Sequence, residues 1–150
     1  SDAATNSLTI PAAKRIHAGT NWYKNTDERI VLVAHDPADG SAQRTVIRFN
    51  ENASEGFDLA HDGFFLQGYA PKFYSVSNDL MFSVNTLPQL YPEMQIPLGF
   101  EKTTSENFYL ELAESLSNEQ VYLTDLQTNT TVILNVGGQY PFTASEGDIT

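Results

Sequence analysis

The sequence predicts an all-β fold, an antiparallel β-sandwich of two packed sheets with a jelly-roll-like path. About ten short strand-like runs follow one another with turn residues between them, at the roughly 8–12-residue spacing typical of sandwiches. Nine Phe and seven Tyr, with many Thr, Val and Ile, favour strands over helices. The 150 residues suffice for one domain with its own core, in which residues 1–7 are expected to be a flexible lead-in.

Strands in the first half of the chain are marked by apolar runs that end at turn residues. The clearest run, ERIVLVAH at residues 28–35, is almost continuously apolar, which predicts a strand that is buried on both faces or central in its sheet. The turn-rich loop 36–40 then returns the chain into RTVIRF at residues 44–49, so the two runs are expected to form a hairpin. The strands expected in this half are residues 8–10, 28–35, 44–49 and 63–68.

Residues 72–112 hold the runs around which the rest of the chain is arranged. Phe73–Val76 and Leu80–Val84 flank a short Ser-Asn-Asp turn, which predicts a hairpin because Asn and Asp tolerate the backbone angles of tight turns. Residues 94–100 and 107–112 are expected to form a second hairpin around a polar turn.

Proline corners at Leu87-Pro88 and Tyr91-Pro92 separate these two hairpins, because proline donates no ladder hydrogen bond. The chain is therefore expected to cross between the two packed sheets at these corners. Beyond the second hairpin, residues 120–124 and 130–134 are expected to pair as a hairpin around a turn at 125–129, and a last strand is expected at 139–144.

The charge balance excludes several classes of partner. The formal net charge is -11, whereas nucleic-acid binding needs clustered Lys and Arg, and anionic membranes attract basic segments. The sequence has no apolar run near 18 residues, so no membrane span is expected. It also has no cysteine, which excludes disulfides and thiolate metal sites. The charge suits a surface protein that meets divalent cations.

Six segments, taken in order, extend across most of the chain: RTVIRFNENASEGFDLAHD at 44–62, KFYSV at 72–76, NTLP at 85–88, IPLGF at 96–100, VYLTD at 121–125, and YPFTA at 140–144 with Gly147-Asp148. Together they resemble β-sandwich accessory domains of large secreted or cell-surface proteins of the Bacteroidetes. In those proteins the domain lies near the C-terminus, commonly before the sorting segment read by the type IX secretion system.

The resemblance implies a secreted or cell-surface location and a non-catalytic accessory role in adhesion or in binding a glycan or cell-surface polymer. The alternative is a structural spacer that displays the sorting segment and has no ligand of its own. The family pattern continues past Gly147-Asp148 into a strand that begins with Arg-Phe, whereas this sequence ends at Thr150. A sheet edge left open in this way is expected to pair with Leu8–Ile10, or with a second molecule through strand-mediated self-association.

The acidic loop 50–62 is one candidate site. Its carboxylate and amide oxygens are of the kind that a hard cation such as calcium needs, although their spacing is not that of an EF-hand. The alternative is a solvated loop whose Asp and Asn side chains cap turns. The residues proposed as calcium ligands are Glu51, Asn52, Glu55, Asp58 and Asp62.

Exposed aromatic residues are the second candidate, because a flat ring beside polar groups can stack on the C–H face of a sugar. Trp22 and Tyr23 stand beside Lys24, and Tyr69 and Tyr91 are further glycan-binding candidates. The alternative is that Trp22 closes one end of the core.

Catalytic and zinc-binding patterns are weak. His17, His35 and His61 lie in separate segments, so a zinc site from His35, His61 and Asp62 is the less favoured interpretation. The sequence contains neither a G-x-S-x-G elbow nor a phosphate-binding glycine loop, and no particular carboxyl pair is marked for glycoside hydrolysis. We therefore expect a binding or structural domain rather than an enzyme.

Overall fold

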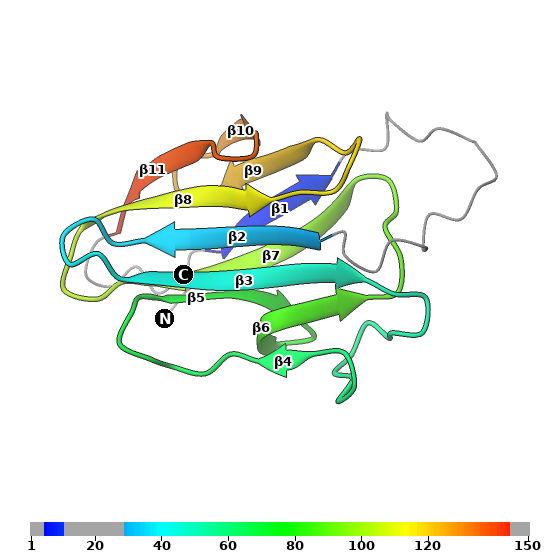
Figure 1. The fold of residues 1–150 in the computed structure, drawn as a ribbon. Helices are drawn as coiled ribbons and strands as arrows, with labels where there is room; N and C mark the ends of the chain where they lie inside the picture. Colours follow the sequence, from blue (N-terminus) through cyan, green and yellow to red (C-terminus); the bar gives the residue numbers. More distant parts are fainter. Residues whose placement is uncertain (1–4, 11–28, 145–150) are drawn as a thin grey trace.

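The computed structural model describes residues 5–10 and 29–144, and every regular element within them is a β-strand. The prediction of an all-β chain is confirmed. The strands are β1 (Thr5–Ile10), β2 (Arg29–His35), β3 (Ala42–Phe49), β4 (Gly63–Phe64), β5 (Lys72–Ser77), β6 (Leu80–Leu87), β7 (Met94–Glu101), β8 (Asn107–Glu114), β9 (Val121–Asp125), β10 (Thr130–Leu134) and β11 (Gln139–Thr143) (Figure 1).

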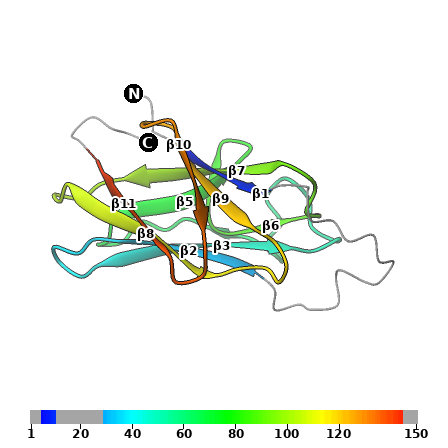
Figure 2. The same cartoon turned by 90° about the horizontal axis from the view of Figure 1, so that it is seen from above.

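All of these strands belong to one hydrogen-bonded sheet, in the order β10-β9-β1-β7-β5-β6-β3-β2-β8-β11, with β4 paired to β6. The sheet curls, so that β8, β2 and β3 lie across from β9, β1, β7 and β5 (Figures 1 and 2). The β3–β6 pair is parallel and the other pairs are antiparallel. The expectation of two separate, purely antiparallel sheets is therefore not confirmed, because the sheet is continuous and mixed.

Strand β6 joins the two halves of the curled sheet. Its first residues pair with β5, where Ser75 lies opposite Phe82. Its last residues pair in parallel with β3, where Val84 lies opposite Val46. The strand continues to Leu87, three residues beyond its predicted end, because β3 offers it a second partner after its pairing with β5 has ended at Phe82.

The core lies between the two halves of the sheet. Strand β2 lies inside the strand order, between β3 and β8, and one of its faces is fully buried, with Ile30 and Leu32 at 0% exposure. On its other face Val31 is buried at 4% exposure, whereas Val33 is half-buried, so burial on both faces is only partly found. Burying several such side chains contributes about 1.5–3 kcal/mol each. The buried cluster draws residues from both halves: Ile30, Leu32, Ala34, Ile47, Phe73, Leu87, Met94, Ile96, Leu98, Phe100, Phe108, Leu110, Leu112, Val121, Leu123, Leu134 and Ala144.

The second predicted hairpin, formed by residues 94–100 and 107–112, is wrong. Strand β7 pairs with β1 and β5, whereas β8 pairs with β2 and β11. Each of the two strands has both edges occupied, so the connection between them crosses from one half of the sheet to the other. The ring of Phe100 meets the ring of Phe108 edge-on, with centroids 4.8 Å apart. A crossing between sheet layers was expected earlier in the chain, at the proline corners between β6 and β7.

The other predicted hairpins are found. Strand β2 pairs with β3, β5 with β6, and β9 with β10. The turn between β5 and β6 has positive φ at Asn78 (48°) and Asp79 (63°), the conformation that favours these residue types. The strand expected at 63–68 is shorter, because only Gly63 and Phe64 form strand, and they pair with β6 across a register shift.

The N-terminal strand is internal to the sheet. Strand β1 lies between β7 and β9 and pairs antiparallel with both. Because β7 and β9 have no direct pairing in this order, β1 supplies the link between them. Leu8–Ile10 was expected to pair with an open sheet edge. In the structure it lies within β1, between two strands, and the ends of the strand order are β10 and β11.

Candidate functional site

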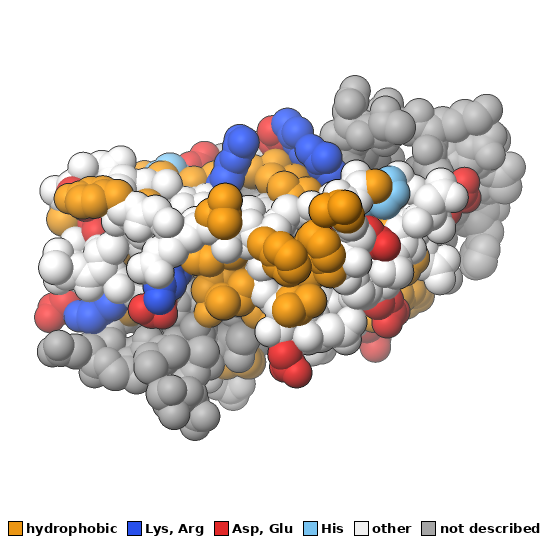
Figure 3. Space-filling model, turned by 90° about the horizontal axis from the view of Figure 1, so that it is seen from below, with side chains coloured by type: hydrophobic (Ala, Val, Ile, Leu, Met, Phe, Trp, Pro, Cys, Tyr) orange, Lys and Arg blue, Asp and Glu red, His pale blue; other side chains and the backbone are white. Residues whose placement is uncertain are grey.

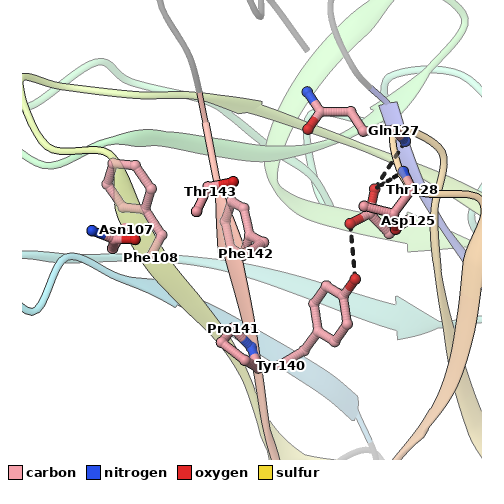
Figure 4. A pocket seen from close by; sticks show the side chains of 9 residues that line it. All are labelled: Asn107, Phe108, Asp125, Gln127, Thr128, Tyr140, Pro141, Phe142 and Thr143. Atoms are coloured by element: carbon pink, nitrogen blue, oxygen red, sulfur yellow. Dashed lines mark hydrogen bonds between the residues drawn. The ribbon is translucent and has the colours of Figure 1, made fainter.

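A pocket of about 310 Å³ opens where β8 and β11 meet the turn between β9 and β10 (Figure 4). Its lining combines three aromatic rings and a proline with two amides, three hydroxyls (one of them on a tyrosine ring) and one carboxyl. The lining residues are Asn107, Phe108, Asp125, Gln127, Thr128, Tyr140, Pro141, Phe142 and Thr143.

The polar side of the pocket is built by the turn after β9. Asp125 ends that strand, and its Oδ1 accepts hydrogen bonds from the backbone N–H groups of Gln127 (2.9 Å) and Thr128 (3.3 Å). This is an Asx-turn, in which a short carboxyl side chain replaces a backbone acceptor. Asn129 follows with a φ of 53° and leads the chain into β10. The turn therefore holds residues 127 and 128 at the pocket margin.

A hydrogen bond joins the two sides of the pocket. The Tyr140 hydroxyl, on β11, donates to Asp125 Oδ2 at 2.8 Å (Figure 4). Asp125 is 4% exposed, so this bond satisfies a carboxylate oxygen that has little access to water. Burial raises the pKa of Tyr140; a hydrogen bond with Thr128 acts against this rise and the bond to Asp125 adds to it. The hydroxyl consequently remains a neutral donor at ordinary pH.

The aromatic side of the pocket is anchored in the core. Phe142 packs edge-on against Phe100, with centroids 4.8 Å apart, and lies 5.8 Å from Phe108. Rings held this way lose little further freedom when a ligand covers them, which favours binding. The amides of Asn107 and Gln127 stand exposed around them.

Chemically, the pocket offers ring faces and neutral hydrogen-bonding groups. Asp125 is the one carboxyl among the nine lining residues, and three donors already bond to it. The residues come from three separate elements, so sequence spacing alone does not bring them together. The sequence signal for this pocket lies in two segments, VYLTD at 121–125 and YPF at 140–142, which carry Asp125 and Tyr140. Both segments were interpreted only as strands of the fold.

The aromatic residues expected to bind glycan lie elsewhere. Tyr69 is 84% exposed and precedes β5, and Tyr91 is 43% exposed in the corner before β7. Neither lines the pocket. Trp22 and Tyr23 lie outside the described residues. The role of all four in binding stays a prediction.

The acidic loop 50–62 uses two of its carboxylates to hold its own backbone. Asp58 Oδ2 accepts the Ser54 N–H, and this bond is the first cause of the lowered pKa of Asp58. Asp62 accepts the N–H of Asp58 (2.7 Å) and the N–H of Thr86 (2.7 Å), which ties the loop to β6. These are the capping contacts of the alternative interpretation.

The other three proposed calcium ligands lie at the loop surface. The side chains of Glu51, Asn52 and Glu55 are exposed, and the backbone carbonyl of Glu55 accepts hydrogen bonds from Ser77 (2.8 Å) and Asn78 (3.0 Å). Across residues 5–10 and 29–144, no group of three or more His, Asp or Glu side chains is arranged to hold a metal. Calcium binding by this loop stays a prediction.

The histidines are separated in the fold. His35, on β2, contacts Glu111 on β8 (Nε2 to Oε2, 2.9 Å) and stacks on Tyr109 with ring centroids 4.5 Å apart. His61 lies in the acidic loop, where its backbone carbonyl accepts the Thr86 hydroxyl at 2.8 Å. His17 lies outside the described residues. The less favoured zinc interpretation gains no support from this arrangement.

A second surface feature lies at the opposite side of the molecule, over β4 and β6. Hydrophobic side chains gather there (Figure 3). Phe64 is 47% exposed and stacks on Phe57 with centroids 4.0 Å apart, while Met81 is 47% exposed. Phe82 beneath them is fully buried. Few polar groups converge on this surface, which distinguishes it from the pocket.

Comparisons with known proteins place the chain in a family. Residues 13–150 match the model of a family described as Domain of unknown function (DUF8693). The chain belongs to this family. No curated protein and no solved structure matches it. The described part of this DUF8693 member contains no helix that is long and apolar enough to cross a membrane.

Proposed function

We propose that this DUF8693 domain is a non-catalytic binding module whose ligand, a glycan or related cell-surface polymer, occupies the pocket between β11 and the β9–β10 turn. The observation that carries the proposal is the composition of the lining. Aromatic rings lie beside exposed amides and hydroxyls. Sugars present C–H faces that stack on rings and hydroxyls that bond to such polar groups.

Charge favours a neutral glycan over an acidic one. The chain carries a formal net charge of -11, so its field repels polyanions before they reach the surface. Lys and Arg are absent from the nine lining residues, and hence no cation there offsets that repulsion. The ligand proposed is therefore a neutral oligosaccharide or polysaccharide.

A binding role fits the lining better than hydrolysis does. Glycoside hydrolysis ordinarily uses two carboxyl groups on either side of the scissile bond, roughly 5–10 Å apart. Asp125 is the one carboxyl in the lining, and its position is fixed by the Tyr140 hydroxyl and by two backbone N–H groups. These contacts assign Asp125 to shaping the pocket.

The setting of the domain is part of the proposal. The segments that resemble Bacteroidetes accessory domains include both Asp125 and Tyr140, and that resemblance supports a secreted or cell-surface protein. We also propose that the facing halves of the curled sheet act as the two layers of a jelly-roll-like sandwich, since the buried cluster draws residues from both. The spacer role is the alternative if the pocket has no ligand.

The test is isothermal titration calorimetry against a panel of neutral oligosaccharides and uronic-acid oligomers. We expect saturable heat with a neutral member. Asn107→Ala and Gln127→Ala each remove an exposed amide from the pocket margin, so each should weaken binding about tenfold, as expected for a lost hydrogen bond. Gln95→Ala is the matched control, because Gln95 is an exposed amide of β7 that does not line the pocket.

Two results would contradict the proposal. Absence of heat with every glycan in the panel would leave the spacer role as the better account. Equal loss of affinity in Gln95→Ala and Asn107→Ala would move the site away from the pocket. Thermal melting of each variant shows whether a change in affinity reflects a change in folding.

A further inference from the structure

The two ends of the sheet differ in how they are protected. Among the described residues, β10 pairs with β9 and β11 pairs with β8, and these two strands end the hydrogen-bonded order. An unpaired strand edge presents a row of N–H and C=O groups to any other strand. Natural proteins block such edges with proline, charged side chains or bulges.

Strand β11 carries one of these blocking devices and β10 carries none. Pro141 stands in the middle of β11, where its lack of an N–H interrupts an edge. The sequence of β10, TTVIL, contains neither proline nor a charged residue, and three of its five residues are β-branched and exposed: Thr130, Thr131 and Ile133. This composition favours strand pairing.

The surroundings of β10 are also uncharged. Residues 126–144 contain no Asp, Glu, Lys, Arg or His, although the whole chain has 19 acidic residues. Large apolar side chains are exposed in this stretch: Leu126 at 52%, Ile133 at 49% and Val136 at 63%. Residues 126–144 thus form a neutral strip with exposed apolar side chains, which includes β10 at one end of the sheet order and β11 at the other.

We propose that two copies of this chain pair through the free edges of their β10 strands. The strands run antiparallel about a two-fold axis at Val132, so that the sheet continues from one copy into the other. Val132 then faces its own copy across the axis, and Thr131 lies opposite Ile133 of the second copy. Directly opposed pairs of this kind are the ones that stabilise antiparallel sheets.

Charge identifies a second copy as the partner. Two chains of net charge -11 repel one another at most relative orientations. The repulsion should be weakest at the strip 126–144, because this stretch of each copy contributes no charge to the contact. An isologous pairing through β10 also leaves no further β10 edge free, so assembly stops at two copies.

The experiment uses a charge exchange on the edge. The double variant Thr131→Lys, Ile133→Lys opposes like charges at both cross-strand pairs, and so does the double variant Thr131→Glu, Ile133→Glu. In an equimolar mixture each Lys lies opposite a Glu. Sedimentation velocity over a wide concentration range measures the association, and circular dichroism melting verifies that each variant folds.

We expect the wild-type chain to show a concentration-dependent monomer–dimer equilibrium. Each double variant should have a dissociation constant at least about tenfold higher, because like charges oppose one another directly. The mixture should recover the dimer as a heterodimer. Val136→Lys is the control, since it adds a charge to the same neutral stretch outside β10 and should leave most of the association intact.

The proposal is overturned if the wild-type chain remains monomeric at every concentration. It is also overturned if both double variants associate as the wild type does, or if the mixture stays monomeric while Val136→Lys dissociates equally. If circular dichroism melting shows that a double variant is unfolded, the proposal is judged on the association of the wild-type chain and of Val136→Lys.

Discussion

The Tyr140 hydroxyl lies 2.8 Å from Asp125 Oδ2 and joins β11 to the end of β9. The two residues belong to strands that are not neighbours in the sheet order. This single bond therefore links the two ends of the curled sheet and shapes the wall of the pocket. The Tyr140–Asp125 hydrogen bond should therefore affect both the stability of the fold and the proposed binding of a ligand in the pocket.

Removing that hydroxyl should destabilise the fold. Tyr140→Phe keeps the ring but leaves a buried carboxylate oxygen without its donor, which costs about 1–3 kcal/mol. The midpoint of urea unfolding at neutral pH measures the change. Tyr122→Phe is a suitable control, because its hydroxyl bonds to the amide of Gln120 rather than to a buried charge. Equal losses in the two variants would deny a special role to the Asp125 bond.

A methyl group at Gly99 should also destabilise the fold, because the ring of Tyr74 lies directly over that glycine. The two residues are paired between β5 and β7, and a Cβ at position 99 would overlap the Tyr74 ring. We expect Gly99→Ala to cost about 1–3 kcal/mol through overpacking. Gly63→Ala is the control, since a Cβ there meets Val84 at an ordinary 3.6 Å.

A double-mutant cycle tests whether the ring is the cause. In the presence of Tyr74→Ala, the added methyl at position 99 enters the space that the ring had filled, so Gly99→Ala should cost much less than in the wild type. Urea unfolding of the two single variants and the double variant measures the coupling. If the two losses are additive, the strain at Gly99 has another source.

The acidic loop should make stability depend on pH below about 4. The pKa of Asp58 is lowered from its ordinary 3.8, chiefly because the carboxylate accepts the backbone N–H of Ser54. The folded chain therefore favours the ionised form, and this contribution is complete above the unfolded pKa and is lost as the pH falls through the lower folded pKa. Stability near pH 2 should accordingly be lower than at pH 7.

Asp58→Asn isolates this contribution. The variant should be less stable than the wild type at pH 7, and the difference should shrink as the pH falls through the lowered pKa of Asp58, because the wild-type carboxyl then becomes protonated. Urea midpoints at a series of pH values give the comparison. Glu51→Gln removes another carboxyl of the same loop without altering the Ser54 contact. A difference that stays constant with pH would show that ionisation of Asp58 does not matter.

Calcium distinguishes the two interpretations of the acidic loop, because a loop that only caps its own turns should show no change in melting temperature with calcium. The carboxylates of Asp58 and Asp62 already accept backbone N–H groups, so an ion would have to compete with these bonds. Differential scanning calorimetry with millimolar calcium, and then with a chelator, measures the effect. A rise in melting temperature that the chelator reverses would instead support the calcium site expected at Glu51–Asp62.

Local sequence patterns predicted much of the fold. The continuous apolar run of β2, the Asn-Asp turn before β6 and the hairpin of β9 and β10 depend on neighbouring residues, and these elements were expected. The pairing of β7 with β8 was wrongly expected, because a short turn between two strands does not reveal that other strands already occupy both edges of each. Strand partners are settled by contacts between segments far apart in the chain.

The candidate pocket shows the same division. The sequence by itself determined an all-β chain, the residue types that form turns, and an acidic surface that disfavours polyanionic partners. Only the tertiary structure decided that Asp125 and Tyr140 meet, and that β10 ends the strand order of the described residues. The physical reason is that turn residues and the alternation of apolar residues reflect interactions within a few residues of the chain. The curl of the sheet, in contrast, brings together segments that are far apart in the sequence and that no local pattern relates.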